Sequence, residues 1–186
     1  MKKEIRLLGI DDAAFDKSKD KETLIIGVFF RGGKSIDGVL SEKVSIDGTD
    51  ATEKIIRMIK KSKFCTQIRA VMLKGIAVGG FNVIDITEIS RKTKIPVIVV
   101  MRRLPDRERI ARILKKLGKK SSIKLMENAG RIYKLDDILI QFKGTTLQKA
   151  KEIIKMSLTR GHIPEPIRVA HLIAGGISLG ESRGRA

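Results

Sequence analysis

Residues 96–101 read PVIVVM, a continuous apolar run that is rich in β-branched side chains. Such a run is typical of a strand that is covered on both faces, as in the parallel part of an α/β sheet. A second apolar run, Ile68–Leu73, precedes it, and the intervening Phe81–Lys92 has a helical pattern. Two strands joined by a helix form a right-handed parallel crossover. These runs therefore predict the parallel centre of an α/β sheet.

Toward the amino terminus, three further strands are predicted. They are Glu4–Ile10, Lys21–Arg31 and Lys34–Ile46, with Gly32-Gly33 as the turn of a hairpin. A helix follows, with its N-cap at Asp50. The order βββαβαβα predicts a mixed five-stranded sheet with helices on both faces. This is the order of the ribonuclease H-like fold.

The rest of the chain, from Pro105 onward, is predicted to be mainly helical. A helix from Pro105 to Gly118 follows the run at 96–101. Arg131–Phe142 has the pattern of short extended pieces, and Thr146–Leu158 and Pro166–Ile177 are predicted to be closing helices. No repeat or linker divides the sequence, so we expect residues 1–186 to form one domain.

Charge is the strongest compositional feature. The chain has 39 Lys and Arg against 21 Asp and Glu, a formal charge of +18. Such a protein is attracted to phosphate backbones and gains free energy when counterions are released. The excess predicts a DNA- or RNA-binding surface that includes Arg102, Arg103, Arg107, Arg109, Arg112, Lys115 and Lys116 and continues to Lys124. The alternative is a solvated helix of a generally basic protein.

The composition also sets expectations about location. The apolar runs are shorter than a membrane span, and the start of the sequence has no hydrophobic signal region. A single cysteine, Cys65, fits a reducing compartment. We therefore expect a soluble cytoplasmic protein without a membrane partner.

Chemically active side chains follow the predicted strands. Asp11 and Asp12 follow the first strand, and adjacent carboxylates are costly to hold together unless a cation, amides or solvent take up their charge. Asp47 follows the third strand. Lys74 follows the fourth, where a glycine-rich turn begins. Each of these aspartates also has an ordinary interpretation, as a helix cap or an exposed turn residue.

Glycines in that turn indicate close backbone approach or a positive φ. Gly75, Gly79 and Gly80 stand at the carboxyl edge of the predicted sheet, where ligands usually bind, so we predict a ligand-binding turn. Near the end of the chain, Arg168 and His171 lie three residues apart on one helical face. Arg168 is predicted to join the nucleic-acid-binding surface; alternatively it could bind a neighbouring carboxylate or a carbonyl end of the backbone. The histidine could equally be a packed core residue.

Several motifs together resemble a largely archaeal protein family, domain of unknown function ninety-nine, which is itself similar to endonuclease V. The motifs span nearly the whole chain. They are GIDDAAF at 9–15, KGIAVGGFNVIDI at 74–86, PVIVVMRR at 96–103 with Pro105-Asp106, PEPIRVAHLIA at 164–174 and GESRGRA at 180–186.

The resemblance implies metal-dependent cleavage of nucleic acid near deaminated bases, with Mg²⁺ or Mn²⁺ held by carboxylates. It implies that Asp11 and Asp47 are catalytic metal ligands, with Asp50 left as an alternative to Asp47. It places His171 near the metal and Arg102 at the position of a catalytic lysine. An arginine there would stabilise negative charge on the phosphate.

Lys74 departs from the family pattern, because the resemblance implies a metal-binding aspartate at this position. An ammonium group repels a divalent cation, so we expect weak metal binding if Lys74 points into the site. We hypothesise that it pairs with Asp11 in place of the metal; the alternative is that it extends to solvent. Three functions stay open: a metal-dependent endonuclease, a non-catalytic nucleic-acid-binding or scaffold protein, and a hydrolase of small phosphate compounds.

Overall fold

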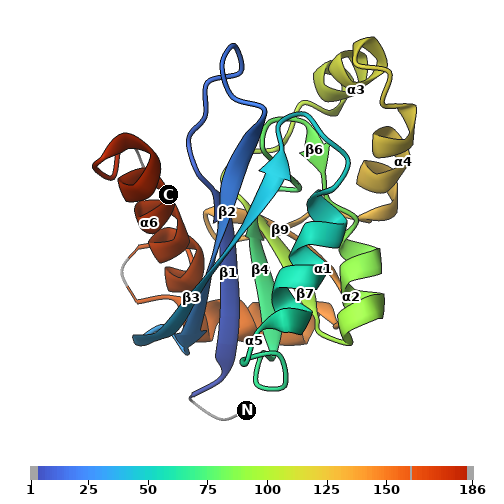
Figure 1. The fold of residues 1–186 in the computed structure, drawn as a ribbon. Helices are drawn as coiled ribbons and strands as arrows, with labels where there is room; N and C mark the ends of the chain where they lie inside the picture. Colours follow the sequence, from blue (N-terminus) through green and yellow to red (C-terminus); the bar gives the residue numbers. More distant parts are fainter. Residues whose placement is uncertain (1–3, 160, 184–186) are drawn as a thin grey trace.

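The computed structural model describes residues 4–159 and 161–183. Its main sheet has seven strands in the order β3-β2-β1-β4-β7-β9-β8, and a separate hairpin pairs β5 with β6 (Figure 1). The strands are β1 (Arg6–Asp12), β2 (Glu22–Arg31), β3 (Ser35–Ser45), β4 (Ala70–Lys74), β5 (Ala77–Val78), β6 (Asn82–Val83), β7 (Val97–Met101), β8 (Tyr133–Leu135) and β9 (Ile138–Lys143).

The pairing pattern confirms the ribonuclease H-like order. β2 pairs antiparallel with β1 and with β3, whereas β1, β4 and β7 are parallel neighbours. The sheet is larger than the predicted five strands, because the segment from Tyr133 to Lys143 forms a hairpin that pairs antiparallel with β7. The hairpin covers an edge of β7 that would otherwise expose unpaired backbone groups.

Helices cover both faces of the sheet (Figure 1). α1 (Ala51–Lys61) and α2 (Ile86–Thr93) pack on one face, and α5 (Leu147–Ser157) and α6 (Glu165–Leu179) pack on the other. α3 (Arg107–Lys116) and α4 (Lys120–Asn128) lie beyond the carboxyl ends of the parallel strands. Among the described residues, no helix has the length and apolar character needed to cross a membrane.

Two predicted helices differ from those observed. The helix predicted at Phe81–Lys92 begins only at Ile86, because the Asp85 side chain caps it and the residues before Asp85 form the β5–β6 hairpin. The helix predicted from Pro105 begins after Asp106, whose carboxylate accepts the amide hydrogen of Arg109. It ends at Lys116, and the separate helix α4 follows.

Gly9 determines how closely α6 approaches β1. A Cβ atom added at Gly9 would lie 2.2 Å from the carbonyl carbon of Pro166, which is backbone that cannot rotate away. We therefore expect Gly9→Ala to lower the free energy of unfolding by about 2 kcal/mol or more, as overpacked core positions do. Urea unfolding measures the change. Gly176→Ala, where an added Cβ would meet nothing within 4 Å, is the matched control; equal losses in both variants would contradict the role assigned to Gly9.

Candidate functional site

The register of the parallel strands brings Asp11 and Lys74 together. Ile10 of β1 is paired with Leu73 of β4, so the next residue on each strand is Asp11 and Lys74. Successive side chains of a strand point to opposite faces. Leu8 and Ile10 face the core under α1 and α2, so Asp11 faces the side covered by α6. Two residues that are 63 positions apart are thus neighbours at the carboxyl edge of the sheet.

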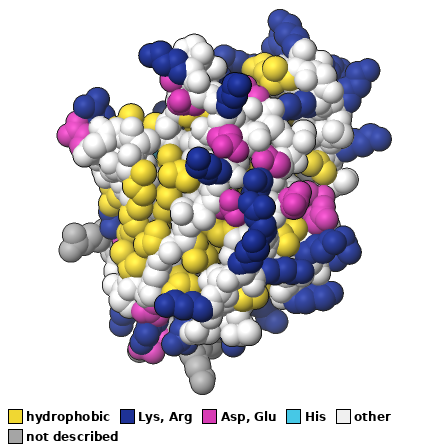
Figure 2. Space-filling view, viewed as in Figure 1, with side chains coloured by type: hydrophobic (Ala, Val, Ile, Leu, Met, Phe, Trp, Pro, Cys, Tyr) yellow, Lys and Arg dark blue, Asp and Glu magenta, His cyan; other side chains and the backbone are white. Residues whose placement is uncertain are grey.

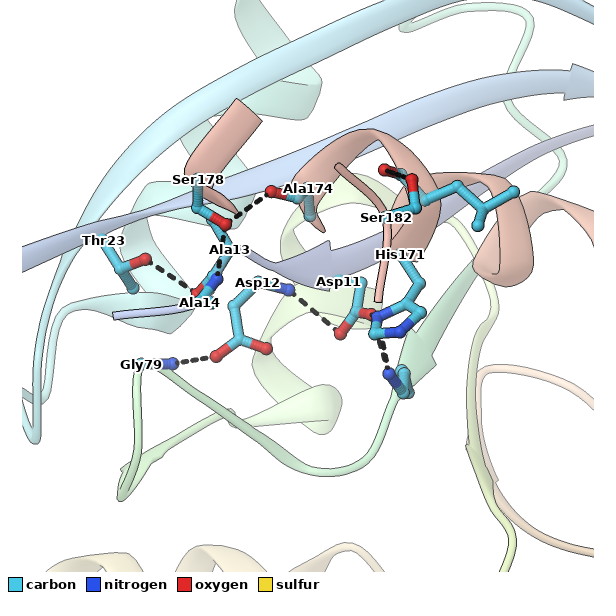
Figure 3. A network of polar contacts seen from close by, with 12 residues as sticks. Asp11, Asp12, Ala13, Ala14, Thr23, Gly79, His171, Ala174, Ser178 and Ser182 are labelled. Atoms are coloured by element: carbon cyan, nitrogen blue, oxygen red, sulfur yellow. Dashed lines mark hydrogen bonds and ion pairs between the residues drawn. The ribbon is translucent and has the colours of Figure 1, made fainter. Parts of the chain in front are cut away.

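α6 contributes the third member of this group. The Asp11 Oδ2 atom lies 3.0 Å from Lys74 Nζ and 2.8 Å from His171 Nδ1, and these two nitrogens are 2.9 Å apart. Figure 3 shows His171 reaching from α6 toward Asp11. Asp11 is 3% exposed and Lys74 is 33% exposed, so the lysine is the member that solvent reaches most readily. We refer to these residues as the Asp11–Lys74–His171 cluster.

The carboxylate of Asp11 organises the protons of this cluster. Both Lys74 Nζ and His171 Nδ1 can donate to Asp11 Oδ2, and this arrangement satisfies a buried carboxylate. When Nδ1 carries the proton of a neutral imidazole, the lone pair is on Nε2. That atom is buried and has no hydrogen-bond partner among the described residues. The structure therefore pairs Lys74 with Asp11, as hypothesised from the sequence.

Asp12 points to the opposite face of the sheet. Its Oδ2 atom accepts a hydrogen bond of 2.8 Å from the Gly79 amide, as Figure 3 shows, and its own amide donates to Asp11 Oδ1. Burial raises the pKa of the Asp12 carboxyl to about 6, the Gly79 hydrogen bond opposes the rise, and the charge of Asp11 adds to it. The ionised form of Asp12 is therefore held in the folded protein at a cost in stability.

Asp12→Asn is expected to stabilise the protein at neutral pH. The folded pKa of about 6 exceeds the ordinary aspartate pKa of 3.8, so the folded state binds this proton more tightly than the unfolded state. The stability from Asp12 is thus fully present below about pH 4 and is lost as the pH rises through 6. We expect a gain of about 3 kcal/mol for the variant at pH 7, and no comparable gain at pH 4.

Urea unfolding at pH 4 and pH 7 measures this difference. The asparagine can still accept the Gly79 hydrogen bond, so the backbone contact is retained. Glu127→Gln, a change at an exposed carboxylate, is the control. A stability gain of Asp12→Asn that is equal at both pH values would contradict the expectation.

Asp47 lies in a different set of contacts. Its carboxylate binds Lys17 Nζ at 3.0 Å and accepts the Phe81 amide at 2.7 Å. The ammonium of Lys119 donates to the backbone carbonyls of Asp47, Gly48 and Phe81. Burial opposes ionisation of Asp47, but these hydrogen bonds and cations hold its pKa below the usual value. Asp47 is thus an ionised carboxylate that already has its cation.

The predicted set of metal ligands is not assembled. Among residues 4–159 and 161–183, no three His, Cys, Asp or Glu side chains lie close enough together to hold a metal ion. Asp11 and His171 meet, but Lys74 lies against both, and Asp47 is paired with Lys17. Asp50 instead accepts hydrogen bonds from Ser45 and Asn82. A divalent cation does not fit beside an ammonium in this arrangement.

The glycine-rich turn has the predicted backbone conformation. Gly75, Gly79 and Gly80 have φ values of +81°, +54° and +83°. An added Cβ at Gly80 would lie 2.3 Å from Asp47 Oδ1, so only glycine permits this carboxylate to approach. The amides at this turn are used by the protein itself, because Asp12 takes that of Gly79 and Asp47 takes that of Phe81. Two amides of the turn therefore bind carboxylates of the same chain, and the ligand-binding role of Gly75, Gly79 and Gly80 stays a prediction.

Most of the predicted nucleic-acid-binding residues lie together on α3 and on the loop before it. We call residues 102–128, which include α3 and α4, the basic arm. Figure 2 shows Lys and Arg side chains gathered over these helices, at the upper right. The exposed members are Arg102, Arg103, Arg107, Arg109, Arg112, Lys115, Lys116, Lys120 and Lys124. Arg102 follows β7 directly, so the arm begins at the sheet edge that holds the Asp11–Lys74–His171 cluster.

Arg168 does not join this surface. Its guanidinium makes three hydrogen bonds of 2.7–3.1 Å to the carboxylate of Glu165, which is buried. The pair lies within α6, three residues from one member to the other, so Arg168 neutralises a buried charge. The structure thus places Arg168 in the second of the two roles considered from the sequence, as the partner of a neighbouring carboxylate.

Lys17, Lys119 and Asn82 were missed by sequence reasoning. Lys17 pairs with the carboxylate of Asp47, and Lys119 donates to the backbone carbonyl of Asp47. The side chain of Asn82 donates to the Asp50 carboxylate and accepts the amide hydrogen of Ala51. Asn82 lies inside the helix predicted at Phe81–Lys92, and its complete burial is a property of the folded chain, so no signal in the sequence indicated its role. The two lysines stand among many others in the sequence, and no local pattern distinguishes them.

Comparison with known proteins assigns the family. The family model described as endonuclease dU matches residues 3–178. The chain belongs to the endonuclease dU family. A relative, the UPF0215 protein of Methanothermobacter thermautotrophicus, is 49% identical over 100% of this chain and 94% of its own length.

Solved structures agree with the fold. A crystal structure of a protein from Archaeoglobus fulgidus has 44% identity and a TM-score of 0.89, and the match covers 95% of this chain and 99% of that chain. Endonuclease V of Ciona intestinalis, in complex with a DNA that contains an inosine, has 14% identity and a TM-score of 0.59, over 90% and 83% of the two chains. The second likeness, at this identity, shows the ribonuclease H-like fold alone.

Proposed function

We propose that this protein binds DNA across the carboxyl edge of its sheet and cleaves the strand next to deoxyuridine. The name of its family supports deoxyuridine as the target. The observation that carries the proposal is the position of the basic arm, which starts at Arg102, at the same sheet edge as the Asp11–Lys74–His171 cluster. Phosphates bound along the arm would lead a strand toward that cluster.

Lys74 is the residue of the cluster best suited to contact a phosphate. Its side chain is 33% exposed, whereas that of Asp11 is 3% exposed. The ammonium, together with Arg102 from the end of β7 at the same sheet edge, would stabilise negative charge that develops on phosphate oxygens. Asp11 holds the ammonium in position, and it also holds His171 through Nδ1. His171 Nε2 would then be the basic atom of the cluster: once substrate binding exposes it, it would take the proton of a water that attacks the phosphorus, while the P–O bond to one strand end breaks and the departing oxygen takes up a proton from solvent.

A non-catalytic binding protein is the second candidate. The observation in its favour is the same contact between Lys74 and Asp11. An ion pair at this place fills the position at which the resemblance implies a metal, and a site filled in this way can hold phosphate without cleaving it. Binding by the basic arm would be identical under both candidates, so binding assays alone do not separate them.

A cleavage assay with matched substrates tests the proposal. The substrates are single- and double-stranded DNAs with one deoxyuridine, the same DNAs with thymidine, and the corresponding RNA. Each is incubated with Mg²⁺, with Mn²⁺ and with a chelator. We expect the rate of cleavage next to deoxyuridine to be at least tenfold above the rate for the thymidine control. The Asp11→Asn variant should lower that rate at least about 100-fold, because it removes the charge that orients Lys74 and His171.

Binding is measured in parallel to interpret the result. Asp11→Asn is expected to keep the affinity of the wild type for DNA, because the basic arm is unchanged. Binding without cleavage by the wild type under all three conditions would favour the second candidate. Equal cleavage of the deoxyuridine and thymidine strands would contradict the proposed target, and strong cleavage by Asp11→Asn would contradict the assignment of the site.

A further inference from the structure

The outer edge of β3 is a free strand edge. β3 is the last strand of the main sheet, and of the described strands only β2 pairs with it. The register shifts at Asp37, and the pairing from Gly38 to Ser45 is regular. This regular part contains no proline, which would block further pairing. A free edge of this kind offers backbone N–H and C=O groups to another strand.

The backbone groups of β3 point alternately toward β2 and away from it. Ile46, directly after β3, donates its amide hydrogen to the carbonyl of Lys21 at 2.9 Å, and these two residues lie one step beyond the opposed pair of Glu22 and Ser45. In an antiparallel pair, every second residue makes such bonds, so the even-numbered residues of the regular part bond to β2. The residues whose backbone groups point outward are Val39, Ser41 and Lys43, and all three are exposed.

An apolar surface adjoins this edge. Ile36 and Val39 are each 49% exposed, although both belong to a strand of the sheet. They lie opposite Phe30 and Val28 of β2, which pack under α6, so they point to the face that α6 covers. Figure 2 shows hydrophobic side chains gathered on the left of the molecule, over β3 and α6. An apolar surface beside a free strand edge indicates a contact with protein.

The charge of β3 differs from that of the rest of the chain. The chain carries a formal charge of +18, but β3 has two acids, Asp37 and Glu42, and one base, Lys43. The two acids are paired with Arg31 and Arg57 of the same chain. This edge therefore does not attract an acidic partner, and a second copy of the basic chain meets little repulsion there.

We propose that β3 pairs antiparallel with β3 of a second copy of the chain, about a two-fold axis at Ser41. In this register Ser41 lies opposite Ser41 of the second copy, and Val39 lies opposite Lys43. All the outward-pointing residues then form hydrogen-bonded pairs, with about six backbone hydrogen bonds in total. No like charges lie opposite each other, whereas an axis at Lys43 would place two ammonium groups together.

The contact area predicts a reversible dimer. β3 has 11 residues, so its edge is about 36 Å long, and a sheet with its side chains is about 10 Å thick. The strip is therefore roughly 360 Å² on each partner, about half of a standard protein interface. Interfaces of this size are weak, so we expect monomer and dimer to exchange at micromolar concentrations or above. The interface leaves the Asp11–Lys74–His171 cluster and the basic arm free.

Sedimentation velocity of the full chain tests for this dimer. Between about 1 and 500 µM, the average mass of the wild type should rise from the monomer mass of 20.7 kDa toward twice that value. Val39→Lys places a second ammonium opposite Lys43 and should raise the dissociation constant at least about tenfold. Gln148→Lys adds the same charge at an exposed position of α5, away from β3, and should dimerise as the wild type does.

Disulfide cross-linking tests the register. Ser41→Cys, in a chain whose Cys65 is replaced by alanine, should form a covalent dimer on mild oxidation. Its two Cα atoms would be about 5.5 Å apart, which is within disulfide reach. Lys43→Cys in the same background is the matched control, because it is exposed on the same face of the strand. Its two copies would be four residues apart along the paired strands, about 13 Å, which is too far for a disulfide.

These measurements contain no DNA, so their outcome is independent of the cleavage assay. A wild type that stays monomeric at every concentration would overturn the proposal. An unchanged dissociation constant in Val39→Lys would assign the dimer to another surface and overturn it as well. Cross-linking by Lys43→Cys in place of Ser41→Cys would refute the two-fold axis at Ser41.

Discussion

Lys74→Asp is expected to create a binding site for Mn²⁺. The variant replaces the ammonium that lies against Asp11 and His171 by a third potential ligand, so three metal-binding side chains would meet at one point. At about 4 Å and an effective dielectric near 20, each unit of charge is worth about 4 kcal/mol. We therefore expect Mn²⁺ affinity, measured by calorimetry, to rise at least about 100-fold, together with a Mn²⁺-dependent rise in Tm.

Lys74→Met is the matched control for this experiment. It removes the same positive charge but adds no ligand, and its length is close to that of lysine. If Lys74→Asp bound Mn²⁺ no better than Lys74→Met, the aspartate would not face the cluster, and Lys74 would not occupy the place of a metal. Tight Mn²⁺ binding by the wild type would contradict the same idea directly.

Neutralising the basic arm is expected to abolish most DNA binding. Arg109, Arg112 and Lys116 are exposed on α3 and line one shallow depression. Replacing all three by glutamine should weaken binding to a DNA duplex about 100-fold at low salt. Because each phosphate contact contributes about 0.9 to the slope of log affinity against log salt, the slope should fall by about 2 to 3. Fluorescence anisotropy over a range of salt concentrations measures both quantities.

A variant with the same loss of charge elsewhere controls for net charge. Lys60, Lys61 and Lys63 are exposed at the carboxyl end of α1, away from the arm, and their triple glutamine variant removes the same three charges. An arm-specific interface requires this variant to bind nearly as tightly as the wild type. Equal losses in the two triple variants would mean that overall charge, and not the arm, attracts DNA.

The centre of the fold was predictable from local pattern. The runs at 96–101 and 68–73 are apolar over lengths that suit buried parallel strands, and the hairpin of β2 and β3 has a glycine turn. These signals require only neighbouring residues. Tyr133–Leu135 and Ile138–Lys143 were predicted as extended pieces but not as sheet members, because joining the sheet depends on a free edge of β7, which is a long-range property.

The sequence identified most residues of the candidate site, but it predicted their relative positions less well. Asp11, Lys74 and His171 were each singled out, and they meet because strand register and α6 bring them together. Asp47 was expected beside them but is bound by Lys17 and reaches the amide of Phe81. The partner of a surface carboxylate among 39 basic residues is decided by loop geometry, which the sequence does not state.

The Asp11–Lys74–His171 cluster takes its members from the first strand, the fourth strand and the last helix, and 160 positions separate Asp11 from His171. During synthesis the basic arm leaves the ribosome well before α6 does. The cluster therefore forms only after α6 has packed against β1 and β4, and a chain cut short before residue 165 lacks its third member.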